Sequence, residues 1–111
     1  MMNEFQMAFA LLGWHALADY PLQGDFMAKA KNPKAPLPGV PWETVMTAHA
    51  LIHGFGVSMI TGSVVLGLAE TVSHWLIDVA KCFGKLDLRA DQGAHFACKI
   101  AWFALAPLGL P

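Results

Sequence analysis

Charged residues are scarce in this sequence. Only 14% of its 111 residues are Asp, Glu, Lys or Arg, against about 25% in an average soluble domain. The formal net charge is −1, which gives no sign of a basic surface, so no nucleic-acid partner is expected. Hydrophobic residues make up 56% of the chain. This length suits one domain, and the composition favours a protein with apolar surface facing lipid.

Cysteine is almost absent. Cys82 and Cys98 are the only two, and their spacing fits neither a CxxC redox motif nor a cysteine zinc site. Both are therefore predicted to be buried small side chains that form neither a disulfide nor a ligand pair.

Proline and glycine divide the chain into predicted helices over about 3–22, 42–60, 64–83 and 91–107. Pro21 is expected to kink or break the first, with a short helical continuation over 23–30. Four prolines within 31–41 predict a loop, because proline disfavours regular structure there. The predicted fold is one all-α domain spanning 1–111, a four-helix transmembrane bundle with short loops and a proline-rich loop between its first two helices.

The distribution of Lys and Arg predicts a topology. The longest run without a charged residue, 44–69, exceeds the ~20 apolar residues that cross a bilayer. Basic residues gather in the first and third loops, which the positive-inside rule places in the cytoplasm. We therefore expect a multi-pass protein of the bacterial inner membrane with both termini outside.

The alternative is a soluble helical bundle with a very apolar core, because His or charge interrupts every candidate span.

Each predicted helix carries polar side chains four residues apart. Residues i and i+4 share one helix face, so each helix presents a polar stripe. When the helix directions alternate, all four stripes reach one level, the cytoplasmic half of the bundle. The stripes are His15, Asp19 and Gln23; His49 and His53; Glu70, His74 and Asp78; and Asp91 and His95, with Lys99 one step further.

A metal site explains this layer best. Carboxylates inside a bilayer must be paired or bound to a cation, and Lys81 and Lys99 are the only bases expected nearby. All five histidines lie in the layer, and imidazole with carboxylate is a ligand set for zinc, with manganese and iron as alternatives. The predicted divalent-metal ligands are His15, Asp19, His49, His53, His74, Asp78, Asp91 and His95.

Taken singly, these residues have simpler explanations. A pair such as His49 and His53 is typical of packing or hydrogen bonding. Asp91 resembles a helix cap, and Glu70 resembles a buried protonated acid bonded to His74 or to a group of the helix predicted over 42–60. The coincidence of four stripes at one level favours the metal site over these separate explanations.

Four motifs, in order, resemble a known family. They are HALADYPLQGDFMAKAK at 15–31, HALIH at 49–53, ETVSHWLIDVAK at 70–81 and DQGAH at 91–95. The set resembles small bacterial and phage membrane proteins known as a domain of unknown function, number three-three-zero-seven. The resemblance implies an integral-membrane helical fold and adds Gln23, Lys81 and Gln92 to the motif residues, but implies no activity. More distantly, the pattern is similar to membrane-bound metal-dependent hydrolases.

Three functions compete, and whether the protein is an enzyme is left open. In a metal-dependent hydrolase, two or more ions would activate water against a lipid or phosphoester, such as a phospholipid headgroup in the surrounding bilayer. Glu70 is then the predicted catalytic base, with Gln23, Lys81 and Gln92 supporting ligands or substrate.

The second function is a non-enzymatic structural or interaction protein of a phage or bacterial membrane. The third, an ion or proton carrier, is disfavoured because the outer half offers no ionisable residue. The sequence leaves an oligomer open.

Overall fold

The chain folds into helices without strands over residues 2–111, which the computed structural model describes. The helices are α1 (Glu4–Asp19), α2 (Gly24–Ala30), α3 (Trp42–Thr61), α4 (Val64–Cys82), α5 (Leu88–Leu105) and the 3-10 helix η1 (Ala106–Leu108). The predicted all-α fold class is confirmed.

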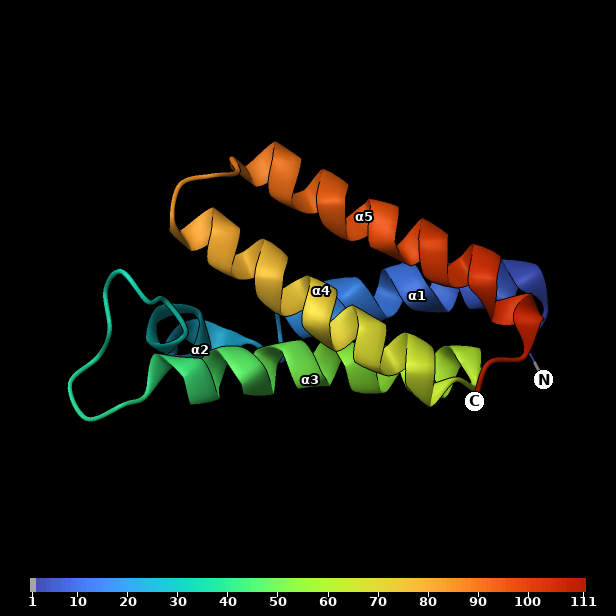
Figure 1. The fold of residues 1–111 in the computed structure, drawn as a ribbon, viewed down its shortest axis with the longest axis horizontal. Helices are drawn as coiled ribbons and strands as arrows, with labels where there is room; N and C mark the ends of the chain where they lie inside the picture. Colours follow the sequence, from blue (N-terminus) through green and yellow to red (C-terminus); the bar gives the residue numbers. More distant parts are fainter. Residues whose placement is uncertain (1) are drawn as a thin grey trace.

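The four long helices form an elongated bundle, and the chain with its loops measures 45 × 25 × 22 Å. α3 and α4 share the most extensive contact, with α1 packed on α3 and α5 on α4. Both chain ends lie at one end of the bundle, and the α2–α3 and α4–α5 loops lie at the other (Figure 1). The short α2 packs against α3.

Local signals explain where the helices begin and end. α1 stops at Asp19, short of the predicted boundary at 22, because Pro21 removes a backbone donor. The turn between α3 and α4 is made by Gly62 in the left-handed conformation and by the Ser63 side chain, which caps α4. α5 begins at Leu88 because Asp87 accepts a hydrogen bond from the Ala90 backbone N–H. α5 therefore begins three residues before the start predicted at about residue 91.

Glycine allows α3 and α4 to approach closely. A Cβ added at Gly54 would lie 1.9 Å from Thr71 Oγ1 and 2.4 Å from the Gly67 carbonyl oxygen. One added at Gly67 would lie 2.7 Å from the Gly54 carbonyl oxygen. Since Gly54 follows His53 directly, this crossing fixes how near the histidines of α3 come to α4.

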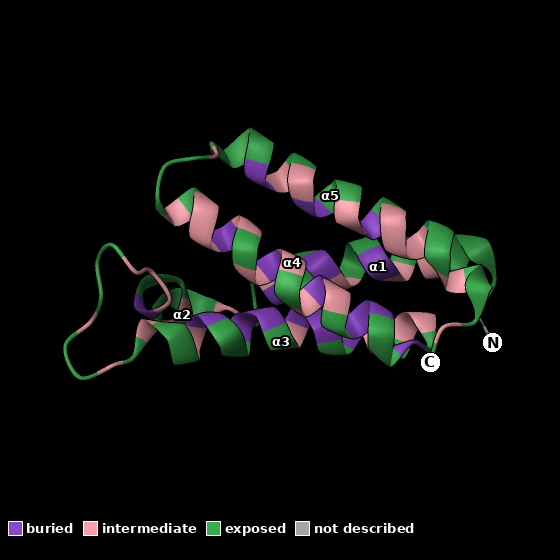
Figure 2. Ribbon diagram, in the orientation of Figure 1, coloured by how far each residue is buried: buried purple, intermediate pink, exposed green. Residues whose placement is uncertain are grey.

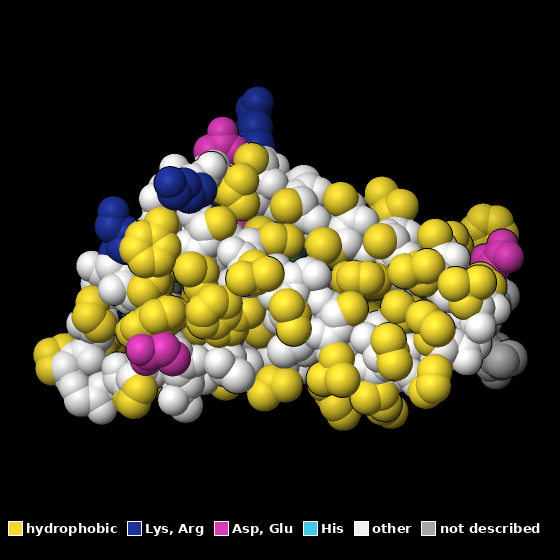
Figure 3. Space-filling view, in the orientation of Figure 1, with side chains coloured by type: hydrophobic (Ala, Val, Ile, Leu, Met, Phe, Trp, Pro, Cys, Tyr) yellow, Lys and Arg dark blue, Asp and Glu magenta, His cyan; other side chains and the backbone are white. Residues whose placement is uncertain are grey.

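The hydrophobic core is small. Leu11, Val57 and Leu66 form it, with partly buried neighbours from the ends of α1, α3 and α5. Buried positions line the inner faces of the helices (Figure 2). Apolar side chains cover much of the outer face shown in Figure 3, with Lys and Arg towards the loop end. Ionisable side chains thus occupy an interior that apolar residues fill in most bundles.

The transmembrane prediction is wrong. Within residues 2–111, none of the helices joins sufficient length to the continuous apolar character that crossing a bilayer requires. α1 has 16 residues, about 24 Å at 1.5 Å per residue, against a hydrocarbon core of about 30 Å. α4 carries Glu70, Asp78 and Lys81, which interrupt its apolar sequence.

This finding corrects every prediction that depended on spanning helices. The inner-membrane location, the outside placement of both termini and the intramembrane setting of the site are withdrawn. So are the three membrane-based functions, namely the hydrolase, the structural or interaction protein, and the ion carrier. Two of the Lys residues at the loop end of the bundle, Lys31 and Lys81, pair with carboxylates described below.

Candidate metal centre

Ionisable side chains of the four long helices meet inside the bundle. Residues four apart lie on one helix face, and in each helix this face is turned inward. The contributors are His15 and Asp19 from α1, His49 and His53 from α3, Glu70, His74 and Asp78 from α4, and Asp91 and His95 from α5. All except Asp19 are buried. The structure thus brings together the side chains that the sequence placed on four stripes.

One group, called site A here, could hold a metal ion. It consists of Asp19, His49, His53 and His74, whose ligand atoms all lie within 4.8 Å of one another. Asp19 Oδ1 is 2.8 Å from His53 Nε2 and 3.4 Å from His49 Nε2. It lies 3.7 Å from His74 Nε2, which is 3.1 Å from His49 Nε2. Ligand atoms around a tetrahedral zinc are roughly 3.3 Å apart, given its ~2.0–2.1 Å bonds, so site A has suitable spacing.

A second group, called site B here, lies beside the first and shares one histidine with it. It consists of His74, Asp78 and His95. Asp78 Oδ1 is 3.1 Å from His95 Nε2, and Asp78 Oδ2 is 3.6 Å from His74 Nε2. The His74 and His95 rings stack with centroids 4.1 Å apart. Buried His and Asp side chains thus form two groups that could hold metal, as the sequence predicted for the cofactor.

Most of the imidazoles make polar contacts through only one nitrogen. The Nδ1 atoms of His15, His49, His53 and His95 are buried without a hydrogen-bond partner. Their Nε2 atoms all approach carboxylates of the cluster. His74 differs, because its Nδ1 atom lies 3.2 Å from Glu70 Oε1. Metal-binding histidines commonly bond a carboxylate in this way through the nitrogen that does not touch the metal.

The carboxylates of the cluster differ in their counter-charges. Lys99 lies 2.6 Å from Glu70, and Lys31 lies 2.7 Å from Asp78. Asp19 instead contacts only imidazoles, and among residues 2–111 no Lys or Arg forms an ion pair with it. Since buried charge requires a partner, Asp19 marks the place where a bound cation is most favourable.

The protonation states of Asp19 and His53 suit metal binding at site A. Burial by itself would raise the pKa of Asp19, but hydrogen bonds from His49 and His53 outweigh it and hold the pKa below its usual range. Burial lowers the pKa of His53 to about 3. Asp19 is therefore ionised and His53 neutral near neutral pH, which are the forms that bind metals.

Site B already holds positive charge in the metal-free chain. Burial opposes protonation of His95, but hydrogen bonds to Asp78 and Asp91 outweigh it and raise the pKa of His95 to about 9. Asp78 thus lies between the His95 imidazolium and the Lys31 ammonium. A metal ion at site B would have to replace these cations.

Glu70 lies behind His74 in a dense hydrogen-bond network. Its Oε1 atom accepts from Lys99 and its Oε2 atom from Trp102 Nε1. Burial would raise its pKa, but hydrogen bonds from His74 and the charge of Lys99 hold the pKa at about 2. Glu70 is thus ionised, unlike the protonated acid considered from the sequence. Its predicted role as a catalytic base stays a prediction.

The other predicted residues surround the two groups. His15 Nε2 lies 3.2 Å from Asp19 Oδ2 and 3.1 Å from Gln92 Oε1. Gln92 also donates to Asp91. Asp91 is buried and faces His95 at 3.4 Å, whereas Asp87 caps the helix. His15, Asp91 and Gln92 thus belong to neither site A nor site B.

The remaining polar residues lie at the edge of the cluster. Gln23 donates to the Asp19 backbone carbonyl at 3.1 Å. The Lys81 side chain is 44% exposed, with its Nζ atom 3.7 Å from Asp91. Their proposed contact with a substrate stays a prediction, as do the lipid and oligomeric partners.

Sequence reasoning missed Lys31 and Trp102. Lys31 follows α2 and reaches a carboxylate 47 positions later in the chain, a distance that no helical spacing predicts. Trp102 lies three positions after Lys99 on the inward face of α5 and donates to Glu70. That spacing was the available signal.

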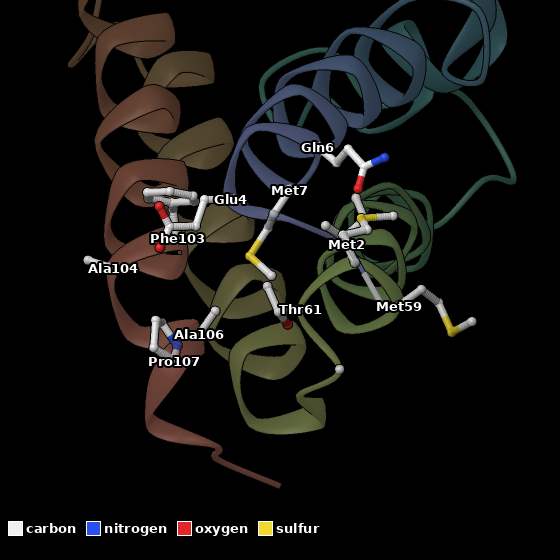
Figure 4. A pocket seen from close by; sticks show the side chains of 12 residues that line it. Met2, Glu4, Gln6, Met7, Met59, Thr61, Phe103, Ala104, Ala106 and Pro107 are labelled. Atoms are coloured by element: carbon white, nitrogen blue, oxygen red, sulfur yellow. The ribbon is translucent and has the colours of Figure 1, made fainter.

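An apolar pocket of about 820 Å³ lies apart from the cluster. The ends of α1, α3 and α5 line it, with Met7, Thr61 and Phe103 facing the space between them (Figure 4). Its lining includes no histidine and, among charged residues, only Glu4. The pocket therefore provides no donor set for a metal.

The fold and this cluster define an all-helical protein with a buried His and Asp centre. The chain belongs to the family described as "Protein of unknown function (DUF3307)", whose model matches residues 7–107. The resemblance seen in the four motifs is confirmed at the level of the family, while its membrane character and its likeness to hydrolases find no support. Comparisons with curated proteins and with solved structures gave no match.

Proposed function

We propose that this chain is a metal-binding protein that holds a divalent transition-metal ion in site A. The supporting observation is the carboxylate of Asp19, which is largely buried and surrounded by imidazoles, with no Lys or Arg partner in the described range 2–111. A divalent ion between Asp19 and the three histidines would supply positive charge beside this carboxylate. It would also tie α1 to α3 and α4.

Zinc is the first candidate. Three imidazoles and one carboxylate match the nitrogen-rich tetrahedral sites that zinc prefers, whereas manganese favours oxygen donors. Iron accepts the same donors and is the second candidate. The two cysteines lie outside both groups, so thiolate-bound metals are not proposed.

Metal content tests the proposal directly. The chain is purified without chelator and its bound metals are measured by elemental analysis. The chelator-treated chain is then titrated with zinc chloride in a calorimeter. At least one tightly bound ion per chain is expected.

Two variants locate the ion. His53→Ala should weaken zinc binding by at least tenfold, because it removes the imidazole nearest Asp19. Cys82→Ser removes a side chain outside both groups and should bind like the wild type. Absence of metal from the purified protein, together with no zinc uptake in the titration, would refute the proposal.

A further inference from the structure

We propose that the cluster holds two metal ions, the second one in site B. This inference rests on the proposed function, because site B adjoins site A and shares His74 with it. The two ions would have separate ligand sets, Asp19, His49 and His53 for the first and His74, Asp78 and His95 for the second. Each set contains two imidazoles and one carboxylate.

His74 decides this division. A neutral imidazole binds an ion through one unprotonated nitrogen, and His74 Nδ1 faces Glu70 Oε1 at 3.2 Å. Only His74 Nε2 is therefore available, and it can bind one ion at a time. When His74 binds the ion of site B, site A keeps Asp19, His49 and His53. Asp19 Oδ1 and His53 Nε2 are 2.8 Å apart.

A carboxylate of each ligand set also lies near a histidine of the other set. Asp78 Oδ2 lies 3.3 Å from His49 Nε2 of the other set. Asp19 Oδ1 likewise lies 3.7 Å from His74 Nε2. Carboxylates that reach both sets can stand between two ions and reduce their repulsion, as in helical bundles that bind metal pairs. Metal ions in such pairs are about 3.5–4 Å apart.

The two sites should fill in order. Within the described part of the chain Asp19 has no Lys or Arg partner, whereas Asp78 is already paired with Lys31 at 2.7 Å. The second ion must displace Lys31 from Asp78. Lys31 can withdraw, because its side chain is partly exposed at the edge of the cluster. We therefore expect tight binding of the first ion and weaker binding of the second.

Three protein ligands leave coordination positions free on each ion. Such incomplete sets are typical of sites that accept water or an external ligand, whereas four protein ligands close a zinc site. With one ion, site A offers four protein ligands. With two ions, each ion has only three protein ligands and keeps a free coordination position.

Zinc stoichiometry of the wild-type chain is the first test. Equilibrium dialysis against increasing zinc chloride, after chelator treatment, should reach two ions per chain in two separable steps. Saturation at one ion overturns this inference and leaves the proposed function standing. Saturation at none overturns both.

Matched variants then place the second ion. His95→Ala and Asp78→Asn each remove a site B ligand and should lower the stoichiometry to one, with the tight step retained. His15→Ala removes a histidine of the cluster that belongs to neither site, and it should still bind two. Two ions in His95→Ala would place the second ion elsewhere and overturn the inference.

A measurement on the wild type avoids variants that fail to fold. The chain loaded with two equivalents of Co²⁺ should give an electron paramagnetic resonance signal weakened by magnetic coupling between neighbouring ions. Two uncoupled Co²⁺ signals would mean distant ions and would overturn the inference.

Discussion

His49 Nε2 lies 3.1 Å from His74 Nε2, across the interface between α3 and α4. Asp19 approaches this pair from one side at 3.4 and 3.7 Å, and Asp78 approaches it at 3.3 and 3.6 Å. Two imidazole nitrogens at this distance can share only one proton between them. Of the two carboxylates, Asp78 is paired with Lys31, whereas Asp19 contacts imidazoles without a Lys or Arg partner among residues 2–111. A divalent cation beside Asp19 would neutralise its charge.

Metal removal should lower stability. An ion that binds only the folded chain stabilises it by about 2.7 kcal/mol when its free concentration is 100 times Kd. Chelator should therefore lower the midpoint of thermal unfolding, and added zinc should restore it. The measurement is a melting curve by circular dichroism at 222 nm. In His53→Ala the same additions should produce a much smaller shift, and an equal shift would argue against site A.

Close packing at Gly54 should matter to both fold and site. Gly54→Ala places a methyl group against Thr71 and the Gly67 carbonyl, and such overpacking costs about 1–3 kcal/mol. The resulting separation of α3 and α4 should also weaken zinc binding. Gly93→Ala is the control, because nothing lies within 4 Å of its added Cβ. Equal urea midpoints for the two variants would contradict this account of the crossing.

The Glu70 and Lys99 ion pair should behave as one unit. Removing one charge of a buried pair leaves the other unpaired, so Glu70→Gln or Lys99→Met should each destabilise the fold by roughly 3–5 kcal/mol. The double variant leaves no isolated charge and should be more stable than either single one. Urea unfolding of all four proteins measures this. Additive losses would show that the two side chains act independently.

The metal-free chain should show a histidine with an unusual pKa. His95 should titrate at about 9 in nuclear magnetic resonance spectra, because hydrogen bonds to Asp78 and Asp91 outweigh its burial. This folded-state pKa lies above the ordinary 6.5. His95 therefore stabilises the metal-free fold fully below pH 6.5, and that contribution is lost as the pH rises through 9.

The variant Asp91→Asn tests the cause of this shift. It removes one of the two carboxylates that face His95 and should lower the pKa of His95. His53 serves as the internal reference, since burial lowers its pKa to about 3 and it should not titrate between pH 5 and 9. A pKa near 6.5 for His95 in the wild type would contradict the ion pairs described here.

The membership of the cluster was largely predictable, but its charge pairing was not. Spacing of four residues fixes which side chains share a helix face. The sequence therefore predicts that His49 and His53 lie on the same face of α3. The pairing of Lys31 with Asp78 does not, because it depends on where α2 lies beside the bundle. The transmembrane prediction failed because it took overall apolar composition as a sign of spanning helices, although charged residues interrupt α4 and α5.

The sequence by itself determined the helical segments and the inward polar face of each, since both depend on contacts within a few residues along the chain. Only the tertiary structure decided which of these polar side chains come within ligand distance of one another. The glycine crossing of α3 and α4 brings His49 to His74, and the packing of α1 on α3 brings Asp19 to both. Such approaches depend on how whole helices pack, and spacing along one helix carries no information about them.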